Sequence, residues 1–338
     1  MSRPVTIRDV ARAAGVHPGT VSRALDDEKR ALVNAETAAR VLEAAQSLGY
    51  RPNRIARGLK TNRSYTIGVL IPDITNPLFP PILRGIEDRL GAAGYTALVV
   101  NTDNDPSRER IHLEAMRARQ VDGFISATAR LDRELLDEIG AGTVPLVLVN
   151  RSLEDRSVSS VTVNDRQGIG LAVDHVVGLG HTRIAHVAGP QNLSTGHRRY
   201  LGFVAAMQAA GLEVIEGLVR YCRYFTEEEG ARACAELLDG GEGPTAIVAA
   251  NDLVALGCYD ALEVRGLSCP RDISIIGFND MPFVDRLQPP LSSVRVPQRE
   301  IGTVAADLLL QSLEDGGEAR EILLDPALVV RGSTAPPP

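Results

Sequence analysis

The sequence has few cysteines, and its histidines do not cluster. The 338 residues include four cysteines that form no CxxC pair, namely Cys222, Cys234, Cys258 and Cys269. Reduced thiols in a cytoplasm are therefore expected. The six histidines are scattered without the spacing of metal ligands. No metal and no cofactor is expected.

Long apolar runs are also missing. No run is long enough to span a bilayer, and the N-terminal string MSRPVTIRDV has no apolar stretch of the signal-peptide kind. Membrane insertion and secretion are therefore not expected, and a cytoplasmic protein is. The length exceeds that of one small domain and predicts two or three domains.

Positive charge is concentrated at one end of a chain whose net charge is −7. Residues 1–63 hold 12 Lys and Arg against 6 Asp and Glu, a net charge of +6, so the remainder is strongly acidic. A small basic module before a large acidic body suggests a nucleic-acid contact at the N-terminus and a different role for the rest. A solvated basic surface would give the same charge, so a motif has to decide.

The first fifty residues read as three short helices. Thr6 with Asp9 forms a capping-box pattern, Pro18 suits the first turn of a second helix, and Asn34 can cap a third. Two short helices joined by a turn at Gly15 predict a helix-turn-helix over residues 1–50. The expected apolar faces are Ile7, Val10, Ala11 and Ala14, then Val21, Ala24 and Leu25, then Ala38, Val41, Leu42, Ala45 and Leu48.

Apolar runs of strand length alternate with helical stretches after residue 64, which predicts an α/β fold with parallel sheets. About 275 residues are too many for one sheet, so two doubly wound subdomains are expected. The predicted strands are 66–71, 96–100, 123–127, 145–149, 183–188, 245–250 and 273–278. The predicted helices are 82–93, 108–119, 198–210 and 252–265.

Polar residues recur just past these strands, where ligands bind in such sheets. Asn, Asp and Arg side chains beside aromatic rings suit a hydroxyl-rich ligand such as a sugar, while a purine or a phosphorylated metabolite stays open. For Asp73, Asp103 and Asp252 the alternative is a cap or turn role. The candidates are Asp73, Asn76, Phe79, Asn101, Asp103, Ser126, Asn150, Arg151, Thr195, Arg199, Phe225, Asn251, Asp252, Asn279 and Asp280.

Catalysis is not expected of the body. The string GIGLAV, residues 168–173, lacks the full GxGxxG pattern and sits at the start of a helix, so helix packing explains it better than a dinucleotide site. Asp252 and Asp280 could form a carboxylate pair, but no nucleophile accompanies them.

Several segments together resemble the lac repressor family of bacterial transcription regulators, in family order over nearly the whole chain. The resemblance implies a helix-turn-helix headpiece, a hinge helix and linker over 51–63, and a core of the periplasmic-binding-protein type over 64–338. The matching segments are 5–25, 50–64, 67–79, 180–190, 250–257, 273–280 and 328–334.

The resemblance places the second helix in the major groove of DNA. The two base-reading positions hold Pro18 and Gly19, which offer no hydrogen-bonding side chain, and His17 stands where the family usually has a serine. Base reading should then depend on Arg23, for which a phosphate contact is the alternative, and on DNA shape. The expected DNA-binding residues are Thr6, His17, Pro18, Gly19, Thr20, Ser22, Arg23, Asn34, Asn53, Arg54, Ala56 and Leu59, and Arg8 is a further phosphate or capping position.

The family resemblance also implies two core subdomains, a dimer and an effector. The N-terminal subdomain would span about 64–161 and 292–323, and the C-terminal one about 162–291 and 324–334. The expected effector-binding residues are Asp73, Asn76, Phe79, Ser126, Asn150, Arg151, Thr195, Arg199, Phe225, Asn251 and Asn279, of which Asn279 stands where relatives often carry Asp. A homodimer on a near-palindromic operator is expected, and a solute-binding receptor without a DNA role is the alternative.

Residues 53–60 give a first testable prediction. Eight residues are too few for a stable isolated helix, since roughly 12 to 15 are needed, so this segment should fold on the operator. The resemblance implies that Leu59 wedges into the central base step of the minor groove, although it could instead pack on the core. Leu59→Ala should weaken operator binding strongly without changing effector affinity, and an unchanged operator affinity in a gel-shift titration would exclude the wedge.

Overall fold

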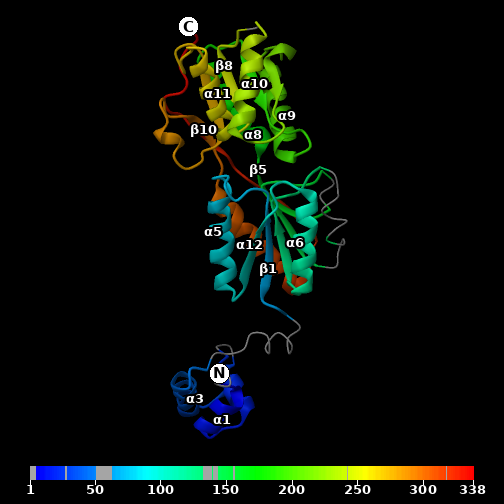
Figure 1. Ribbon diagram of the computed structural model, residues 1–338, viewed down its shortest axis with the longest axis vertical. Coiled ribbons are helices and arrows are strands. Elements are labelled where there is room, and N and C mark those ends of the chain that lie inside the picture. Colours follow the sequence, from blue (N-terminus) through cyan, green and yellow to red (C-terminus); the bar gives the residue numbers. More distant parts are fainter. Residues whose placement is uncertain are drawn as a thin grey trace. The chain divides into compact units, whose positions relative to one another are not determined.

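The computed structural model describes residues 5–26, 29–50, 63–131, 139, 144–154, 157–241, 243–316 and 318–338. These residues belong to two compact units, Met1–Ser64 and Tyr65–Pro338. Figure 1 labels their helices and strands. Each unit has its own core and is described by itself.

The first unit is the predicted three-helix bundle. At its first helix, Asp9 Oδ2 accepts hydrogen bonds from Thr6 N at 2.9 Å and from Thr6 Oγ1 at 2.6 Å, and Gly15 ends the helix with a φ of 65°. Arg30 Nε donates to Ala24 O at 3.0 Å and so satisfies a carbonyl at the end of the second helix. The elements are α1 (Ile7–Ala14), α2 (Pro18–Ala24), the 3-10 helix η1 (Arg30–Leu32) and α3 (Ala35–Ser47).

The core of this unit differs from the predicted apolar faces in α3. Leu42 and Leu48 are 39% and 38% exposed, so their assignment to the inner face was wrong. Ala44 is buried beside Val41 instead. The inner surfaces of α1 and α2 are formed mostly by alanine and valine, and at this close helix spacing α3 also turns its small residues inward.

The second unit contains the two predicted parallel sheets. The first has the strand order β11-β5-β4-β3-β1-β2, and its described pairs are all parallel. Helices α5 and α6 lie on opposite sides of β1 (Figure 1). The elements of this lobe are β1 (Thr66–Ile71), α5 (Phe79–Ala92), β2 (Thr96–Asn101), α6 (Pro106–Ala118), β3 (Gly123–Ser126), β4 (Leu146–Val149), β5 (Ser159–Val163), α12 (Gln298–Asp315) and β11 (Glu321–Leu324).

The second sheet has the order β12-β10-β9-β8-β6-β7, and only its edge strand β12 is antiparallel to its neighbour. The elements of this lobe are α8 (Asp165–Gly178), β6 (Ile184–Ala188), α9 (Ser194–Ala209), η2 (Glu216–Leu218), β7 (Val219–Tyr221), α10 (Glu227–Asp239), β8 (Ala246–Ala249), α11 (Asp252–Val264), β9 (Ser274–Asn279), η3 (Val284–Arg286), β10 (Ser292–Arg295) and β12 (Ala327–Val329). Every residue of β9 is buried, as expected for a central parallel strand covered on both faces.

The chain passes between the two lobes three times. It leaves the first sheet after β5, returns after β10, and leaves again between β11 and β12. The second passage lies after Arg295, a few residues later than position 291, because β10 pairs with β9 and β12 in the second sheet. The predicted helices 82–93 and 198–210 begin earlier, at Phe79 and Ser194.

The GIGLAV string belongs to a packed helix. Gly168, in the first turn of α8, lies so close to β9 that a Cβ would come within 2.6 Å of the Phe278 ring. Gly170, two residues later, has no atom within 4 Å of the corresponding point. The close contact between α8 and the sheet therefore requires glycine at position 168, in agreement with the helix-packing explanation of this string.

The described part of the chain contains no helix that is long and apolar enough to cross a membrane. Between residues 5 and 338, leaving aside the stretches without a description, no group of three or more His, Cys, Asp or Glu side chains could hold a metal ion.

The two glycines of α8 give a matched pair of variants. Gly168→Ala should lower the free energy of unfolding by about 1 to 3 kcal/mol, because the new methyl group overlaps the Phe278 ring. Gly170→Ala should leave it unchanged or raise it by up to about 1 kcal/mol, because alanine is the better helix former. Urea unfolding measures both, and equal effects of the two variants would contradict the packing explanation.

Candidate functional site

The predicted DNA-contact residues of the first unit lie on and around α2. His17 is the N-cap residue of α2, and its Nδ1 accepts a hydrogen bond of 3.1 Å from Gly19 N. Nδ1 therefore acts as the acceptor in this contact, which leaves Nε2 as the possible donor of the ring. An imidazole thus supplies the N-cap of α2.

Arg23 and Ser22 are exposed on α2, as a DNA-reading role requires. Arg23 Nε donates to Gly19 O at 3.2 Å, one turn back along the helix. Pro18, Gly19 and Thr20 are half-buried. Thr6 and Asn34 hold capping positions, the latter accepting from Glu36 N at 2.9 Å. The remaining predicted DNA contacts lie outside the described residues: Asn53, Arg54, Ala56 and Leu59.

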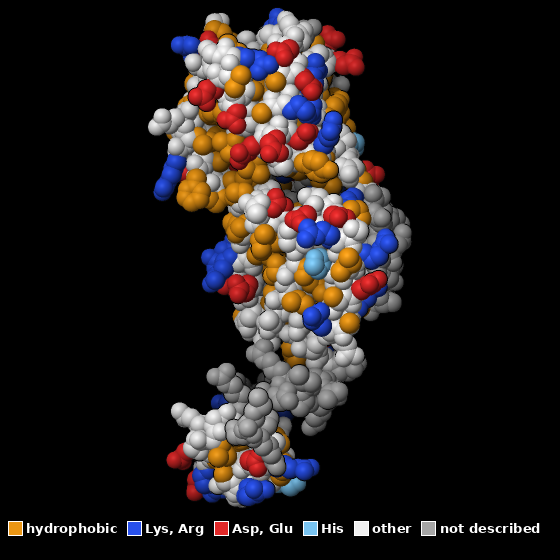
Figure 2. Space-filling view, viewed as in Figure 1, with side chains coloured by type: hydrophobic (Ala, Val, Ile, Leu, Met, Phe, Trp, Pro, Cys, Tyr) orange, Lys and Arg blue, Asp and Glu red, His pale blue; other side chains and the backbone are white. Residues whose placement is uncertain are grey.

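A cavity of about 680 Å³, counted with the solvent at its mouth, lies between the two lobes of the second unit. The surface is indented where these lobes meet (Figure 2). Every predicted effector residue except Ser126 lines this cavity. The lining residues are Pro72, Asp73, Asn76, Leu78, Phe79, Asn104, Asn150, Arg151, Pro190, Leu193, Thr195, Arg199, Tyr224, Phe225, Thr226, Asn251 and Asn279.

Sequence reasoning missed seven lining residues, six of which lie within three positions of a candidate residue, while Pro190 lies five positions before Thr195. Asn104 follows Asp103 and shares its positive φ, 57° against 52°. Reading each loop after a strand to its end would have found them. They are Pro72, Leu78, Asn104, Pro190, Leu193, Tyr224 and Thr226.

Arg199 is a cavity-lining side chain that is fixed by several contacts. It is 2% exposed, and its Nε donates to Asp165 Oδ1 at 2.7 Å while its Nη1 donates to Ala250 O at 2.8 Å. The guanidinium also lies over the Phe278 ring at 3.8 Å. Burial raises the pKa of the Asp165 carboxyl, and the positive charge of Arg199 opposes this rise. This geometry fixes Arg199 before any ligand arrives.

Three lining residues have buried polar atoms without a hydrogen-bond partner in the described structure. They are Arg151 Nε, Thr195 Oγ1 and Asn279 Oδ1. A buried polar atom without a partner costs free energy, about 1 to 3 kcal/mol in proteins. These atoms come from three different segments around one cavity, and each retains hydrogen-bonding capacity that the described protein does not use.

Aromatic and apolar side chains complete the wall. Phe79 is buried at the start of α5, and Phe225 lies 5.9 Å from the Arg199 guanidinium. Phe225 covers Gly189 so closely that a Cβ there would be 2.4 Å from the ring. Apolar rings together with amides and a guanidinium suit a ligand that has both apolar and hydroxylated surface.

Turn and cap roles do hold for several candidates. Asp73 Oδ1 accepts from Thr75 N at 2.9 Å, and Asn251 Oδ1 caps α11 by accepting from Val254 N at 2.8 Å. Asp103 is paired with Arg108 and bonded to Asn101, and neither Asp103 nor Asn101 lines the cavity.

Ser126 lies behind the cavity wall. It is completely buried, and its Oγ is 2.8 Å from Thr128 Oγ1, which in turn is bonded to Glu109. The same segment reaches the cavity indirectly, since Arg151 Nη1 donates to Thr128 O at 3.4 Å.

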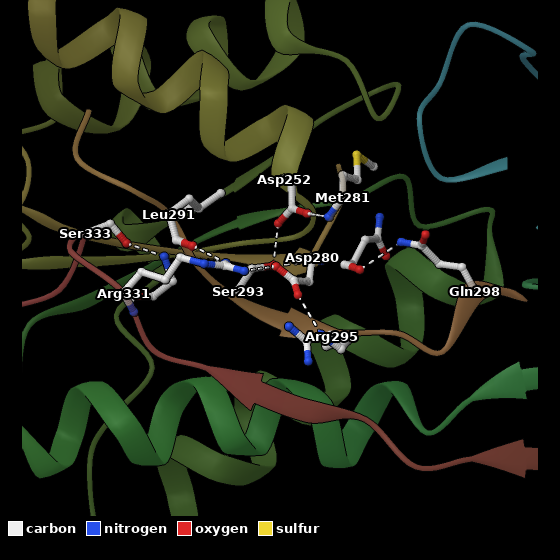
Figure 3. A network of polar contacts seen from close by, with 11 residues as sticks. Asp252, Asp280, Met281, Leu291, Ser293, Arg295, Gln298, Arg331 and Ser333 are labelled. Carbon is white, nitrogen blue, oxygen red and sulfur yellow. Dashed lines mark hydrogen bonds and ion pairs between the residues drawn. The ribbon is translucent and has the colours of Figure 1, made fainter. Parts of the chain in front are cut away.

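Asp252 and Asp280 form hydrogen bonds and ion pairs within one structural network (Figure 3). Asp252 accepts from Ser293 Oγ at 2.5 Å and from Met281 N at 2.7 Å, and burial raises its pKa to about 7. Asp280 is paired with Arg295 and Arg331 at 2.7 and 2.6 Å. These carboxylates join β9, β10 and the segment after β12, and neither lines the cavity.

His186 lies on β6 in the same lobe as Arg199. It is fully buried, stacks on Phe203 with ring centroids 4.7 Å apart, and bonds through Nδ1 to Val248 O at 2.7 Å. Its Nε2 has no partner in the described structure, and burial lowers its pKa to about 4. The folded protein therefore holds this ring neutral.

This lowered pKa predicts a pH-dependent loss of stability. Below about pH 6.5 the unfolded chain protonates His186 and the folded chain does not, so stability falls until about pH 4. His186→Asn removes this term. The variant should have a lower free energy of unfolding than the parent, and this difference should shrink by about 2 kcal/mol between pH 7 and pH 5. Urea titrations at the two pH values measure it. Asp252 has the opposite effect, because it favours folding as the pH falls, but it is present in both proteins and cancels in the comparison. A difference in unfolding free energy that is the same at both pH values would contradict the prediction.

A helix-turn-helix unit that precedes two parallel sheets with a polar cavity between them defines a class of protein, the ligand-responsive DNA-binding regulators. Residues 6–53 match the bacterial regulatory proteins of the lacI family, and residues 173–334 match the periplasmic binding protein-like domain.

Curated relatives match over almost the entire chain. The HTH-type transcriptional regulator DegA of Bacillus subtilis is 34% identical over 98% of both chains. The ribose operon repressor of Escherichia coli is 33% identical over 97% of this chain and 99% of that one. The chain therefore belongs to the lacI family. It is a DNA-binding transcription regulator with an effector-binding domain, and not an enzyme.

Solved structures of related regulators are similar to this chain over almost its whole length. The lac repressor dimer bound to operator and the anti-inducer ONPF superposes with a TM-score of 0.86 at 28% identity, covering 98% of this chain and all of that one. A complex of the transcriptional regulator CelR with cellobiose has a TM-score of 0.74 at 31% identity, with the same coverage.

Proposed function

We propose that this protein is a cytoplasmic repressor that binds a near-palindromic operator as a homodimer and releases or tightens its hold when a sugar occupies the cavity between the lobes. The observation that carries the proposal is the cavity itself. Its lining combines amides, two guanidinium groups and aromatic rings with three buried polar atoms that have no protein partner.

The DNA-binding part of the proposal is supported by charge and by geometry. Residues 1–63 carry a net charge of +6, which favours phosphate contacts. Arg23 and Ser22 are exposed on α2, and His17, whose Nδ1 caps the helix, has Nε2 left as a possible donor. The helix N-terminus otherwise presents Pro18 and Gly19, so shape and deformability of the operator carry much of the specificity.

A sugar effector is supported by the lining and by the relatives. Five asparagines, which can both donate and accept, surround the space, and Phe79 and Phe225 offer apolar faces. A related regulator was solved with cellobiose, and another relative is named for the ribose operon.

Regulation follows from the way the lobes are joined. Three passages of the chain connect them, so a ligand that contacts both lobes changes their relative position. In a dimer this movement alters the spacing of the two headpieces. Effector and operator affinities are then coupled, and the coupling acts equally in both directions.

A solute-binding receptor without a DNA role remains the competing function, since the two-lobed fold is shared. The two functions separate in one comparison. For a regulator, deletion of residues 1–63 abolishes duplex binding and leaves ligand-induced thermal stabilisation intact. The decisive experiment selects duplexes from a random pool with the full chain, and we expect enrichment of a near-palindrome. Enrichment of no sequence, with and without candidate sugars, would refute the proposal.

Arg199 and Asp165 provide a test of the cavity. Arg199→Met combined with Asp165→Asn removes both charges, so no buried carboxylate is left unpaired. We expect the affinity for a sugar found by thermal-shift screening to fall about 10- to 100-fold, because charge-assisted hydrogen bonds are lost.

The matched control is Arg265→Met combined with Asp239→Asn, an ion pair of 2.8 Å between α10 and α11 that is remote from the cavity lining. Calorimetric titration of both double variants should show the loss in the first alone. Equal affinities in the two would place the effector elsewhere.

A further inference from the structure

The two buried guanidinium groups of the cavity differ in charge compensation. Arg199 is paired with Asp165 at 2.7 Å. Arg151, which is 5% exposed, forms no ion pair with any described carboxylate. Its Nη1 and Nη2 donate only to neutral oxygens, Thr128 O and Asn104 Oδ1, both at 3.4 Å, and its Nε has no partner.

Nearby charges do not replace the missing partner. Glu109 attracts Arg151, but it is bonded to Thr128, and Arg130 adds a second positive charge nearby. Burial lowers the pKa of Arg151 to about 10, which still leaves the group protonated at neutral pH. A buried, uncompensated cation is costly, so an anion that enters the cavity gains most at this point.

The opposite lobe presents a second group that favours an anion. Helix α9 is 16 residues long and begins beside the cavity, with Leu193 as an N-cap residue that has no side-chain hydrogen bond. Thr195, in its first turn, is 2% exposed and keeps Oγ1 without a partner. An uncapped helix N-terminus with a free hydroxyl is suited to bind carboxylate or phosphate oxygens.

A hydrogen bond holds these two groups next to each other. Ser152 N donates to Ser194 Oγ at 3.0 Å, and these residues directly adjoin Arg151 and Thr195. The lining contains one carboxylate, Asp73, whose Oδ1 is already engaged by Thr75.

We propose that the effector is an anionic sugar derivative whose carboxylate or phosphate binds between Arg151 and the first turn of α9. This inference rests on the proposed function, because it concerns the ligand of the same cavity. The anion supplies the partner that Arg151 lacks, and its oxygens accept from the guanidinium, Thr195 Oγ1 and the first-turn amides. A neutral sugar offers the guanidinium only hydroxyl oxygens and no negative charge to pair with the buried cation.

A first experiment needs no knowledge of the sugar and uses inorganic phosphate with the full chain. Phosphate also stabilises proteins by exclusion from their surface, but this general effect is the same in all variants. We expect a phosphate-dependent rise in melting temperature that is larger in the parent than in Arg151→Gln. Arg151→Lys, which keeps the charge, should retain part of the excess.

The control variant is Arg130→Gln, which removes a neighbouring positive charge that does not line the cavity. It should keep the excess stabilisation of the parent. An identical phosphate response in the parent and in Arg151→Gln, or an equal loss in the Arg130 variant, would overturn the proposal.

A second experiment separates carboxylate from phosphate. Calorimetry compares ribose with ribonate and ribose 5-phosphate, and glucose with gluconate and glucose 6-phosphate. We expect the tightest ligand to be an acid that binds at least about tenfold better than its neutral parent, with Arg151→Gln removing the preference. A neutral sugar that binds as tightly as its acid forms overturns the proposal. Failure to bind any operator would refute the proposed function without touching this result, because the readout here is ligand affinity.

Discussion

The buried ion pair between Arg199 and Asp165 is the interaction on which the effector site depends. It joins the first turn of α8 to α9, and the second bond of Arg199 to Ala250 O adds the end of β8. The guanidinium also lies on the Phe278 ring of β9, which in turn packs against Gly168. Loss of either charge would leave the other unpaired and cost about 3 to 5 kcal/mol. Preorganised in this way, the cavity floor loses little entropy when a ligand binds.

The rest of the cavity is built on a joint between the lobes. Asn164 marks one passage of the chain: its side chain caps α8 in one lobe, while its N–H donates to Leu324 O at 3.0 Å in the other. On the α9 side, Ser152 N bonds to Ser194 Oγ, and Arg198 pairs with Glu321 at 3.4 Å. These contacts cross the joint directly, so any change in the angle between the lobes must break or reshape them. A ligand that strengthens or displaces them shifts the equilibrium between arrangements of the lobes.

Much of this organisation could be predicted from the sequence because strand ends and helix caps have local signals. The seven predicted strands of the body all form, and candidate residues after five of them, β1, β4, β6, β8 and β9, line the cavity. The candidates after β2 and at the end of β3 do not. Ser126 does not line the cavity, because a side chain at a strand end can point to either face of the sheet and its hydroxyl is bonded to Thr128. Leu42 and Leu48 failed because helical periodicity does not tell a core of alanines from one of leucines. The short edge strands β7, β11 and β12 have no long apolar run that could announce them.

The helix-turn-helix headpiece has few side chains at the start of α2 that can tell one base from another. His17 uses Nδ1 to cap α2, and Pro18 and Gly19 have no side-chain donors, so each headpiece has few direct means of telling base pairs apart. On the proposed function, a single headpiece reads bases chiefly through Arg23 and otherwise relies on phosphate contacts, which give affinity with little specificity. In the proposed dimer, specificity comes from engaging two half-sites at once, which depends on the spacing of the headpieces. An effector that alters this spacing therefore changes the main source of operator specificity. The less sequence information each headpiece reads alone, the more strongly the effector controls operator binding.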